Sequence, residues 1–181
     1  NFLRTCKLCD QNAKNLDCRK PVITREFEFK KSAFSKINNI TFVAVSDWLA
    51  GEAKKSFLKD KEIVTIHNGI NTDVFKLLDI PKNNQFTVIS VASCWTERKH
   101  LDILLGLADE LKDINFVVVG EVGTVDKNRY TNVDFIGKTS SAEELCRLYN
   151  SSHVFANFST EETFGLVTAE AMACGLPVIA F

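Results

Sequence analysis

The segment FTVISVASCWTERKHLDILLGLADELKDINFVVVG, residues 86–120, decides the fold. Residues 86–92 and 115–120 are short runs rich in β-branched and apolar side chains, which predict two buried strands. Between them, residues 101–112 place apolar side chains at helical spacing. A strand, a helix and a second strand in this order predict a parallel pair, because the crossover helix returns the chain to run in the same direction.

The same alternation extends along the chain in both directions. We expect strands at residues 40–46, 62–66, 133–137, 153–159 and 177–181, and helices at residues 24–37, 46–58, 142–150 and 163–174. Ser46 and Ser141 precede two of these helices and are expected to cap them. The pattern predicts an α/β fold with a Rossmann-like, doubly wound parallel sheet in residues 76–181, C-terminally incomplete. Residues 1–75 read as the end of a preceding α/β domain and the connection to the sheet.

Composition excludes several classes of protein. The formal net charge is −1, so no bulk positive field attracts the chain to nucleic acid or to an anionic membrane. The longest apolar stretch falls well short of the ~20 residues that span a bilayer. The chain begins with Asn1, with neither an initiator Met nor a signal peptide pattern, and we expect it to start within a longer protein.

The six cysteines fall into two groups. Three form the pattern C-x2-C-x8-C in a polar segment: Cys6, Cys9 and Cys18. A zinc site needs four ligands, so Asp10, Asp17 or a group outside the chain would have to complete it. We favour the alternative of unpaired or locally bridged cysteines, and hence no metal. The remaining three lie singly in apolar surroundings, where a free cysteine is expected to behave as a small hydrophobe: Cys94, Cys146 and Cys174.

Ligands of open α/β sheets bind beyond the carboxyl ends of the strands, where the loops SCWTERKH (93–100) and STEETFG (159–165) are expected. The first loop places Arg98, Lys99 and His100 directly before a helix. Cations beside a helix N-terminus form a site for an anion, especially a phosphate. The alternative is a solvated cluster of charges.

The run EETFGLVTAEAMACGLPV, residues 161–178, carries an unusual glutamate. Glu170 lies eight residues after Glu162 and is flanked by alanines and a methionine. At about 100° per residue, two helical side chains with this spacing point to within about 80° of each other, so both could reach one elongated ligand. A carboxylate in such surroundings needs hydrogen-bond partners, and sugar hydroxyls would suit it. The alternative is that Glu161 and Glu162 serve the helix dipole and that Glu170 is solvated.

From Glu162 onward, E-T-F-G-L-V-T-A-E-A-M-A-C-G-L-P-V resembles the E-x7-E motif of retaining glycosyltransferases of family 4. These enzymes have the GT-B fold, in which two Rossmann-like domains face each other across a cleft. VSDWLA and IHNGINTDVF resemble the end of the N-terminal domain and the interdomain connection, and VASCWTERKHLDILL resembles the phosphate loop. The resemblance covers residues 40–181 and is closest to bacterial enzymes that build capsule, exopolysaccharide or lipopolysaccharide.

The resemblance implies roles for individual residues. Glu162 would contact hydroxyls of the donor sugar, and Glu170 would hold the ribose hydroxyls of the nucleotide. Arg98 and Lys99 would neutralise the diphosphate leaving group. The family needs no metal, so these cations would replace a divalent ion, and no cofactor is expected beyond the nucleotide-diphospho-sugar substrate.

Backbone groups complete the implied site. Amides at the start of the helix, those of Phe164, Gly165 and Leu166, would face the diphosphate and sugar. A second segment, Gly137 and Lys138, would lie by the base. The family often has Lys-Gly at the positions where this chain has Lys99-His100, so His100 departs from the family pattern. His100 is therefore expected to be a surface residue.

The function that this resemblance implies is transfer of a sugar, with retention, from a UDP- or GDP-sugar to a glycan or lipid-linked acceptor in cell-surface polysaccharide biosynthesis. The alternatives are a nucleotide-sugar binding module without turnover, or another GT-B enzyme such as a nucleotide-sugar epimerase. We expect the chain alone to be inactive, because the acceptor half is missing from it. The expected location is the cytoplasm, with peripheral contact to the inner face of the membrane left open.

Overall fold

The computed structural model of the protein describes residues 20–180. The chain divides into two compact units, of which the first ends at Asn68 and the second begins at Gly69. The boundary expected from the sequence, after residue 75, lies later than this one. Phe75 belongs to the second unit because its ring is only 8% exposed and packs against Tyr149 with 6.2 Å between ring centroids.

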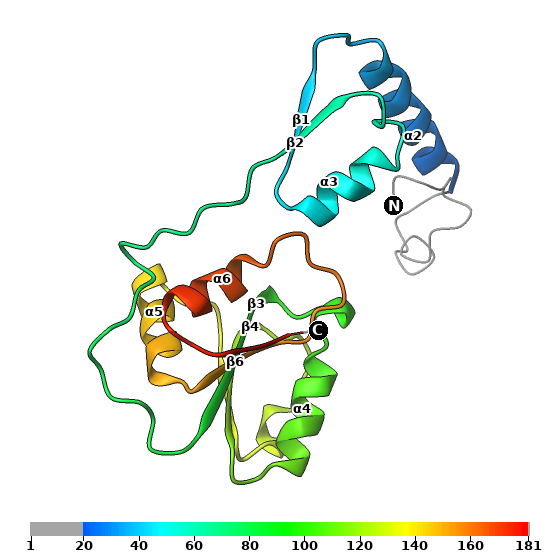
Figure 1. Ribbon diagram of the computed structural model, residues 1–181. Helices are drawn as coiled ribbons and strands as arrows, with labels where there is room; N and C mark the ends of the chain where they lie inside the picture. Colours follow the sequence, from blue (N-terminus) through cyan, green and yellow to red (C-terminus); the bar gives the residue numbers. More distant parts are fainter. Residues whose placement is uncertain (1–19, 181) are drawn as a thin grey trace. The chain divides into compact units, whose positions relative to one another are not determined.

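Between residues 20 and 68, the described part of the first unit has two helices and two parallel strands (Figure 1). In chain order these are α2 (Lys20–Ser35), β1 (Thr41–Ala44), α3 (Asp47–Lys54) and β2 (Glu62–Thr65). The cap predicted for α3 is present, since the Leu49 N–H donates to the Ser46 hydroxyl over 3.2 Å. Phe34 of α2 packs edge-on against Phe42 of β1, which joins the helix to the strand pair.

The second unit is a five-stranded parallel sheet with helices on both faces. Its elements are β3 (Thr87–Cys94), the short 3₁₀ turn η2 (Glu97–Lys99), α4 (Leu101–Glu110), β4 (Asn115–Glu121), η3 (Lys127–Arg129), β5 (Val133–Ile136), α5 (Ala142–Ser151), β6 (Val154–Asn157), α6 (Leu166–Ala173) and β7 (Val178–Ala180). The strand order is β5-β4-β3-β6-β7. The predicted Rossmann-like sheet is therefore confirmed.

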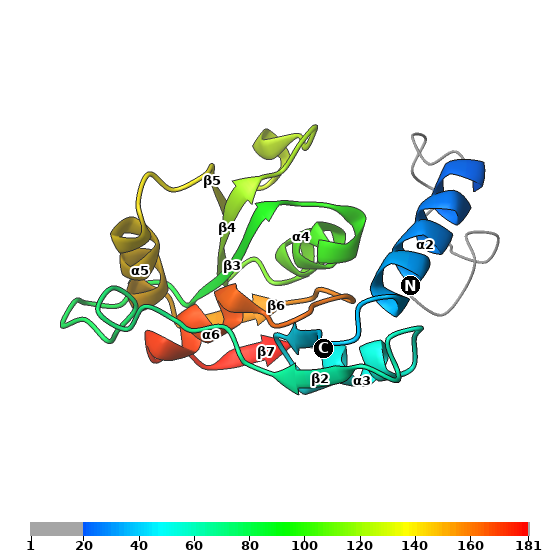
Figure 2. The ribbon, with the colours of Figure 1, turned by 90° about the horizontal axis from the view of Figure 1, so that it is seen from above.

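Alternation along β4 produces the three layers of this unit. Val117 and Val119 are buried on one face of the sheet, in a cluster with side chains of α5 and α6. Phe116 and Val118 are buried on the other face, in a cluster with apolar side chains of α4. Figure 2 shows α4 on one side of the sheet and α5 with α6 on the other. Burial on both faces explains why the strand reads as a continuous apolar run.

The carboxyl ends of β3 and β4 approach each other closely at a glycine. Gly120 has a φ of 112°, and a Cβ atom built on it would lie 1.7 Å from the carbonyl oxygen of Ala92. The pairing of the two strands also shifts register between Val91 and Cys94. Cys94 is exposed, unlike the apolar surroundings predicted for it, whereas Cys146 and Cys174 are buried.

A buried asparagine holds the far end of α4. The side-chain amide of Asn132 donates to the carbonyl groups of Ala108, Leu111 and Ile114 over 3.0, 3.1 and 3.0 Å. The last carbonyls of a helix have no partner within it, and this amide supplies one for Ala108 in the last turn of α4, while Leu111 is the cap and Ile114 lies in the connection to β4. It thereby joins the end of α4 to the start of β5.

Replacing Gly120 by Ala should destabilise the second unit by about 3–5 kcal/mol, because the methyl group would overlap a backbone carbonyl at a backbone angle that favours glycine. The measurement is urea unfolding of the whole chain. Gly106→Ala is the control: no atom lies within 4 Å of the new methyl group, so the helix should gain up to about 1 kcal/mol. Equal stability of the two variants would contradict the close approach.

Candidate functional site

The candidate site lies where the connections of the sheet change direction. From β3 the chain continues to β4 on one side, whereas β6 pairs with β3 on the other side. Such a switch point leaves room between the loops that follow the two strands, and ligands of α/β sheets bind there. The loops are residues 95–100 and 158–165, and both contain residues that the sequence analysis singled out.

Three polar contacts join these two loops. The Thr160 N–H donates to the carbonyl of Arg98 over 3.1 Å. The ammonium of Lys99 lies 2.8 Å from the Glu162 carboxylate, and the guanidinium of Arg98 lies 3.1 Å from that of Glu161. The structure therefore brings together Arg98, Lys99 and Glu162, the three residues predicted to act on the leaving group and sugar.

The two ion pairs differ in their exposure to solvent. The side chains of Lys99 and Glu162 are 30% and 33% exposed, whereas those of Arg98 and Glu161 are 50% and 49% exposed. Ion pairs that face water contribute at most about 1 kcal/mol. An anion with several oxygens can therefore displace both carboxylates at little cost. Glu161 is exposed and pairs with Arg98 rather than with the start of the helix alone.

The start of α6 faces the same loop. Gly165 precedes Leu166 with a φ of 82°, and no side chain caps the helix. The first amides of a helix lack intrahelical partners and carry partial positive charge. Glu162 lies before the helix, so the predicted angle between it and Glu170 does not apply. Glu162 is instead placed by the loop, where its Cγ atom lies 3.5 Å from the position of a Cβ on Gly165.

The remaining residues of this helix start differ in burial. Phe164 is half-buried, while the Leu166 side chain is 45% exposed. Their predicted contribution is through backbone amides, which burial of the side chain does not prevent. The exposed leucine leaves apolar surface at the opening of the site.

Glu170 is half-buried on α6, and a tyrosine of α5 provides its partner. The Tyr149 hydroxyl lies 3.4 Å from Oε2 of Glu170. Burial raises the pKa of Glu170 above its ordinary value, and this hydrogen bond lowers it. The carboxylate does have a polar partner, as predicted, but the sequence does not identify Tyr149 as that partner. Its helical position identifies it only as a core side chain.

Gly137 and Lys138 follow β5 and are exposed. They lie at the same edge of the sheet as the two loops, but β4 separates β5 from β3. The predicted cap of the next helix is present, since the Glu144 N–H donates to the Ser141 hydroxyl over 3.1 Å. The carboxylate of Glu144 accepts from Ser140 over 2.7 Å, which lowers its pKa. The short segment between β5 and α5 is thereby held in place.

His100 has a left-handed backbone, with φ 50° and ψ 53°, at the junction of η2 and α4. It is the only residue other than glycine with a positive φ in the part of the chain that the structure describes. The family pattern has glycine near this position, which such a backbone favours. The His100 side chain is partly exposed, and its backbone shapes the turn that presents Lys99.

The described residues contain no group of three or more His, Cys, Asp or Glu side chains that could hold a metal ion. The cysteine pattern at Cys6, Cys9 and Cys18 lies outside the described residues. Within residues 20–180, no helix combines the length and the apolar character that crossing a membrane requires.

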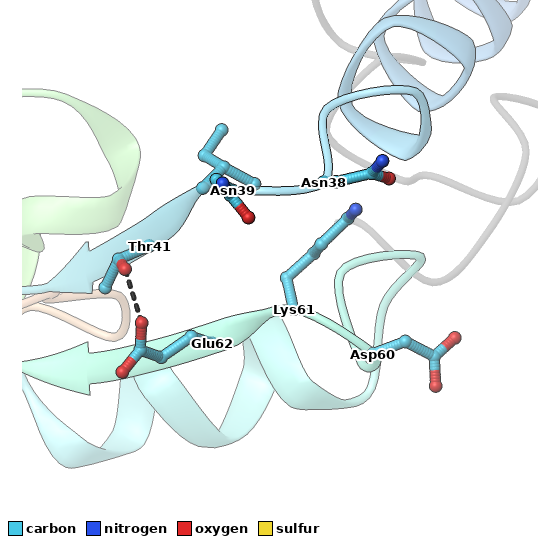
Figure 3. Close-up of a pocket in the computed structure, with 7 residues that line it drawn as sticks. Asn38, Asn39, Thr41, Asp60, Lys61 and Glu62 are labelled. Carbon is cyan, nitrogen blue, oxygen red and sulfur yellow. Dashed lines mark hydrogen bonds between the residues drawn. The ribbon is translucent and has the colours of Figure 1, made fainter.

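A separate pocket of about 450 Å³ lies in the first unit (Figure 3). It is lined by the segments that begin β1 and β2, residues 38–41 and 60–62. Thr41 donates to Glu62 across it, and the Lys61 ammonium donates to the carbonyl of Ile37 over 2.6 Å. Because this pocket is at the amino ends of its strands, it is not placed like the ligand sites of α/β sheets.

Comparison with known proteins identifies related chains. Residues 85–181, more than half of the chain, match the family model described as Glycosyl transferases group 1. An uncharacterized glycosyltransferase of Methanocaldococcus jannaschii is 26% identical over 156 residues, which cover 81% of this chain and 41% of that protein.

Two solved structures have a similar fold. Sucrose-phosphate synthase from Thermosynechococcus elongatus superposes with a TM-score of 0.72 at 20% identity, over 94% of this chain and 47% of that one. The pneumococcal O-GlcNAc transferase GtfA, solved with UDP and GlcNAc, gives a TM-score of 0.66 at 21% identity, over 87% of this chain and 32% of that one. The chain thus spans less than half the length of each of these proteins.

The left-handed backbone at His100 predicts the relative stability of two variants. His100→Gly should be about 1 kcal/mol more stable than His100→Ala, because alanine retains the steric cost of this conformation. Both variants lose the contact of the imidazole with Asp102, which makes the pair matched. Urea unfolding of both proteins measures the difference, and a more stable alanine variant would contradict the assigned backbone.

The raised pKa of Glu170 predicts how its replacement depends on pH. The protonated side chain suits the fold better than the carboxylate, so stability is lost as pH rises from the ordinary value of 4.5 through the raised one. Glu170→Gln should therefore raise the melting temperature at about pH 7 and change it little near pH 4. Solvent screens the half-exposed charge, so we expect a gain of about 2 °C. Thermal unfolding at both pH values tests this, and a larger gain in acid would overturn it.

Proposed function

The chain belongs to the glycosyl transferases group 1, and from that membership we propose that residues 69–180 bind a nucleotide-diphospho-sugar as glycosyl donor. The observation that carries the proposal is the meeting of two cations, Arg98 and Lys99, with the uncapped start of α6 at the switch point of the sheet. Cations and oriented amides at one place suit a diphosphate.

Binding of the diphosphate would exchange partners within the site. Its oxygens would replace Glu161 and Glu162 as acceptors for Arg98 and Lys99, which are now paired over 3.1 and 2.8 Å. Glu162 would then be free to accept hydrogen bonds from hydroxyls of the donor sugar beside Gly165. The two carboxylates therefore hold the cations in position in the arrangement that the structure shows.

The nucleoside would lie on the side of Glu170. Its carboxylate would accept hydrogen bonds from the two ribose hydroxyls, and Gly137 and Lys138 would lie near the base. The pneumococcal GtfA structure, which has a similar fold and contains UDP and GlcNAc, supports a nucleotide-sugar as the ligand.

The reaction would break the bond between the anomeric carbon of the sugar and an oxygen of the diphosphate. Negative charge then grows on the departing nucleoside diphosphate, and stabilising charge where it develops is the largest effect available to such a site. Arg98, Lys99 and the amides of Phe164, Gly165 and Leu166 would supply it, without a metal ion. We propose retention of the anomeric configuration, as in the enzymes that share the E-x7-E spacing.

The activity of the whole protein is a broader proposal. It would transfer the sugar to a glycan or lipid-linked acceptor in cell-surface polysaccharide biosynthesis, in the cytoplasm at the inner face of the membrane. Since this chain spans 41% of its relative from M. jannaschii, acceptor binding is assigned to the remainder of the protein. Transfer assays on the full-length protein distinguish this function from a binding module without turnover.

Two substitutions should distinguish binding of the nucleotide from binding of the sugar. Glu170→Gln should weaken UDP or GDP binding about 10- to 100-fold, because a charged acceptor for the ribose is lost. Glu162→Gln should leave nucleotide affinity unchanged or tighter, since it releases Lys99, but should weaken binding of UDP-glucose or GDP-mannose about tenfold. Calorimetry with each ligand measures both effects.

Glu110→Gln is the control, because this exposed residue ends α4 away from the site. Absence of binding of either nucleotide by the unmodified chain would overturn the donor site. Unchanged affinities in both variants would leave the site in place but refute the roles of the two glutamates.

A further inference from the structure

Tyr149 is the strongest feature of the site that the proposed function has not used. Its side chain is fully buried in α5, and its hydroxyl lies 3.3 Å from the carbonyl oxygen of Val167 and 3.4 Å from Oε2 of Glu170. We propose that Tyr149 is a positioning residue that orients the Glu170 carboxylate and keeps it ionised for the ribose hydroxyls. This inference rests on the proposed function, since it assumes that Glu170 holds the nucleotide.

Tyr149 can act only as a neutral hydrogen-bond donor here. Burial, and next the charge of Glu170, raise the pKa of Tyr149 far above the physiological range. Its single proton is shared between two acceptors at long distances, and the charged carboxylate is the stronger acceptor of the two. The hydroxyl therefore stabilises the ionised form of Glu170, and because it stays protonated it adds no second negative charge beside it.

The tyrosine ring packs against two aromatic side chains that lie outside α6. It packs edge-on against Phe155 of β6, with 5.8 Å between ring centroids, and its centroid lies 6.2 Å from that of Phe75, which precedes β3. The position of its hydroxyl is thus set by the core. Because Oε2 of Glu170 faces this fixed donor, Oε1 remains for the ribose.

Other titratable groups near Glu170 do not supply this function. Cys146 of α5 and Cys174 at the end of α6 have their sulfur atoms 3.7 Å apart, and burial with the contact to Cys146 raises the pKa of Cys174 to about 12. Lys76 reaches this cluster through its backbone carbonyl, which accepts from the Cys146 thiol. Among the described residues, Glu170 forms no ion pair, so the Tyr149 hydroxyl is the group that opposes the effect of burial on it.

The consequence is a change in the pH dependence of nucleotide binding. The ribose hydroxyls need the ionised carboxylate as acceptor, so affinity falls as pH drops through the pKa of Glu170. Tyr149→Phe removes the interaction that lowers this pKa and should move the loss of affinity to higher pH. A role of Tyr149 in packing alone would change stability without moving this midpoint.

The experiment uses calorimetry of UDP and GDP with the whole chain from about pH 5 to pH 8. Tyr149→Phe should weaken binding about three- to tenfold at neutral pH and more in acid, with the midpoint shifted upward. The chain has two tyrosines, so Tyr130→Phe is a matched control, because Tyr130 packs against Phe135 in the α4 cluster. In the Glu170→Gln background, Tyr149→Phe should leave the pH profile unchanged.

A titration of the Glu170 carboxyl carbon by nuclear magnetic resonance separates this inference from the function on which it rests. If the chain binds neither nucleotide, the donor site fails, and an unchanged carboxyl titration in Tyr149→Phe would also overturn the role of the tyrosine. If the chain binds nucleotide and Tyr149→Phe keeps the parent pH profile, the positioning role is refuted while the donor site remains. An upward shift in both the titration and the binding midpoint is the expected result.

Discussion

The structure of the second unit depends on the pairing of β3 with β4 on one side and with β6 on the other. Two parallel neighbours fix the direction of β3 and place the ends of all three strands at one edge. The chain must leave β3 and β6 toward opposite faces, because α4 covers one face and α6 covers the other. The opening between their loops is therefore a result of the strand order. Polar side chains of the two loops line it, because no helix crosses there.

Within this opening, each charge already has a partner inside the protein. The two cations pair with carboxylates of the opposite loop, and Glu170 has a neutral donor in Tyr149. A ligand would therefore exchange partners with these groups rather than create contacts from unpaired ones. The net affinity for a ligand is then a difference between two arrangements in which the charges are paired.

The sequence predicted the order and type of the elements, because side-chain periodicity reports the layers directly. It also identified the caps Ser46 and Ser141, since a capping hydrogen bond joins neighbouring residues. It failed for the placement of Glu162, which was treated as helical although α6 begins only after the left-handed Gly165. Tyr149 could not be found, because its contact with Glu170 joins positions 21 residues apart that only the packing of α5 on α6 brings together.

The amide of Asn132 has a consequence for the site at the opposite end of α4. That helix starts after His100, beside the paired cations, and near its end the Asn132 amide binds the carbonyls of Ala108 and the cap residue Leu111. The helix has ten residues, is about 15 Å long, and is held at its C-terminal end. Loss of these hydrogen bonds would let α4 shift along the sheet, and the loop of residues 95–100 before it would shift with it. The alignment of the cations therefore has a second anchor on the far side of the domain.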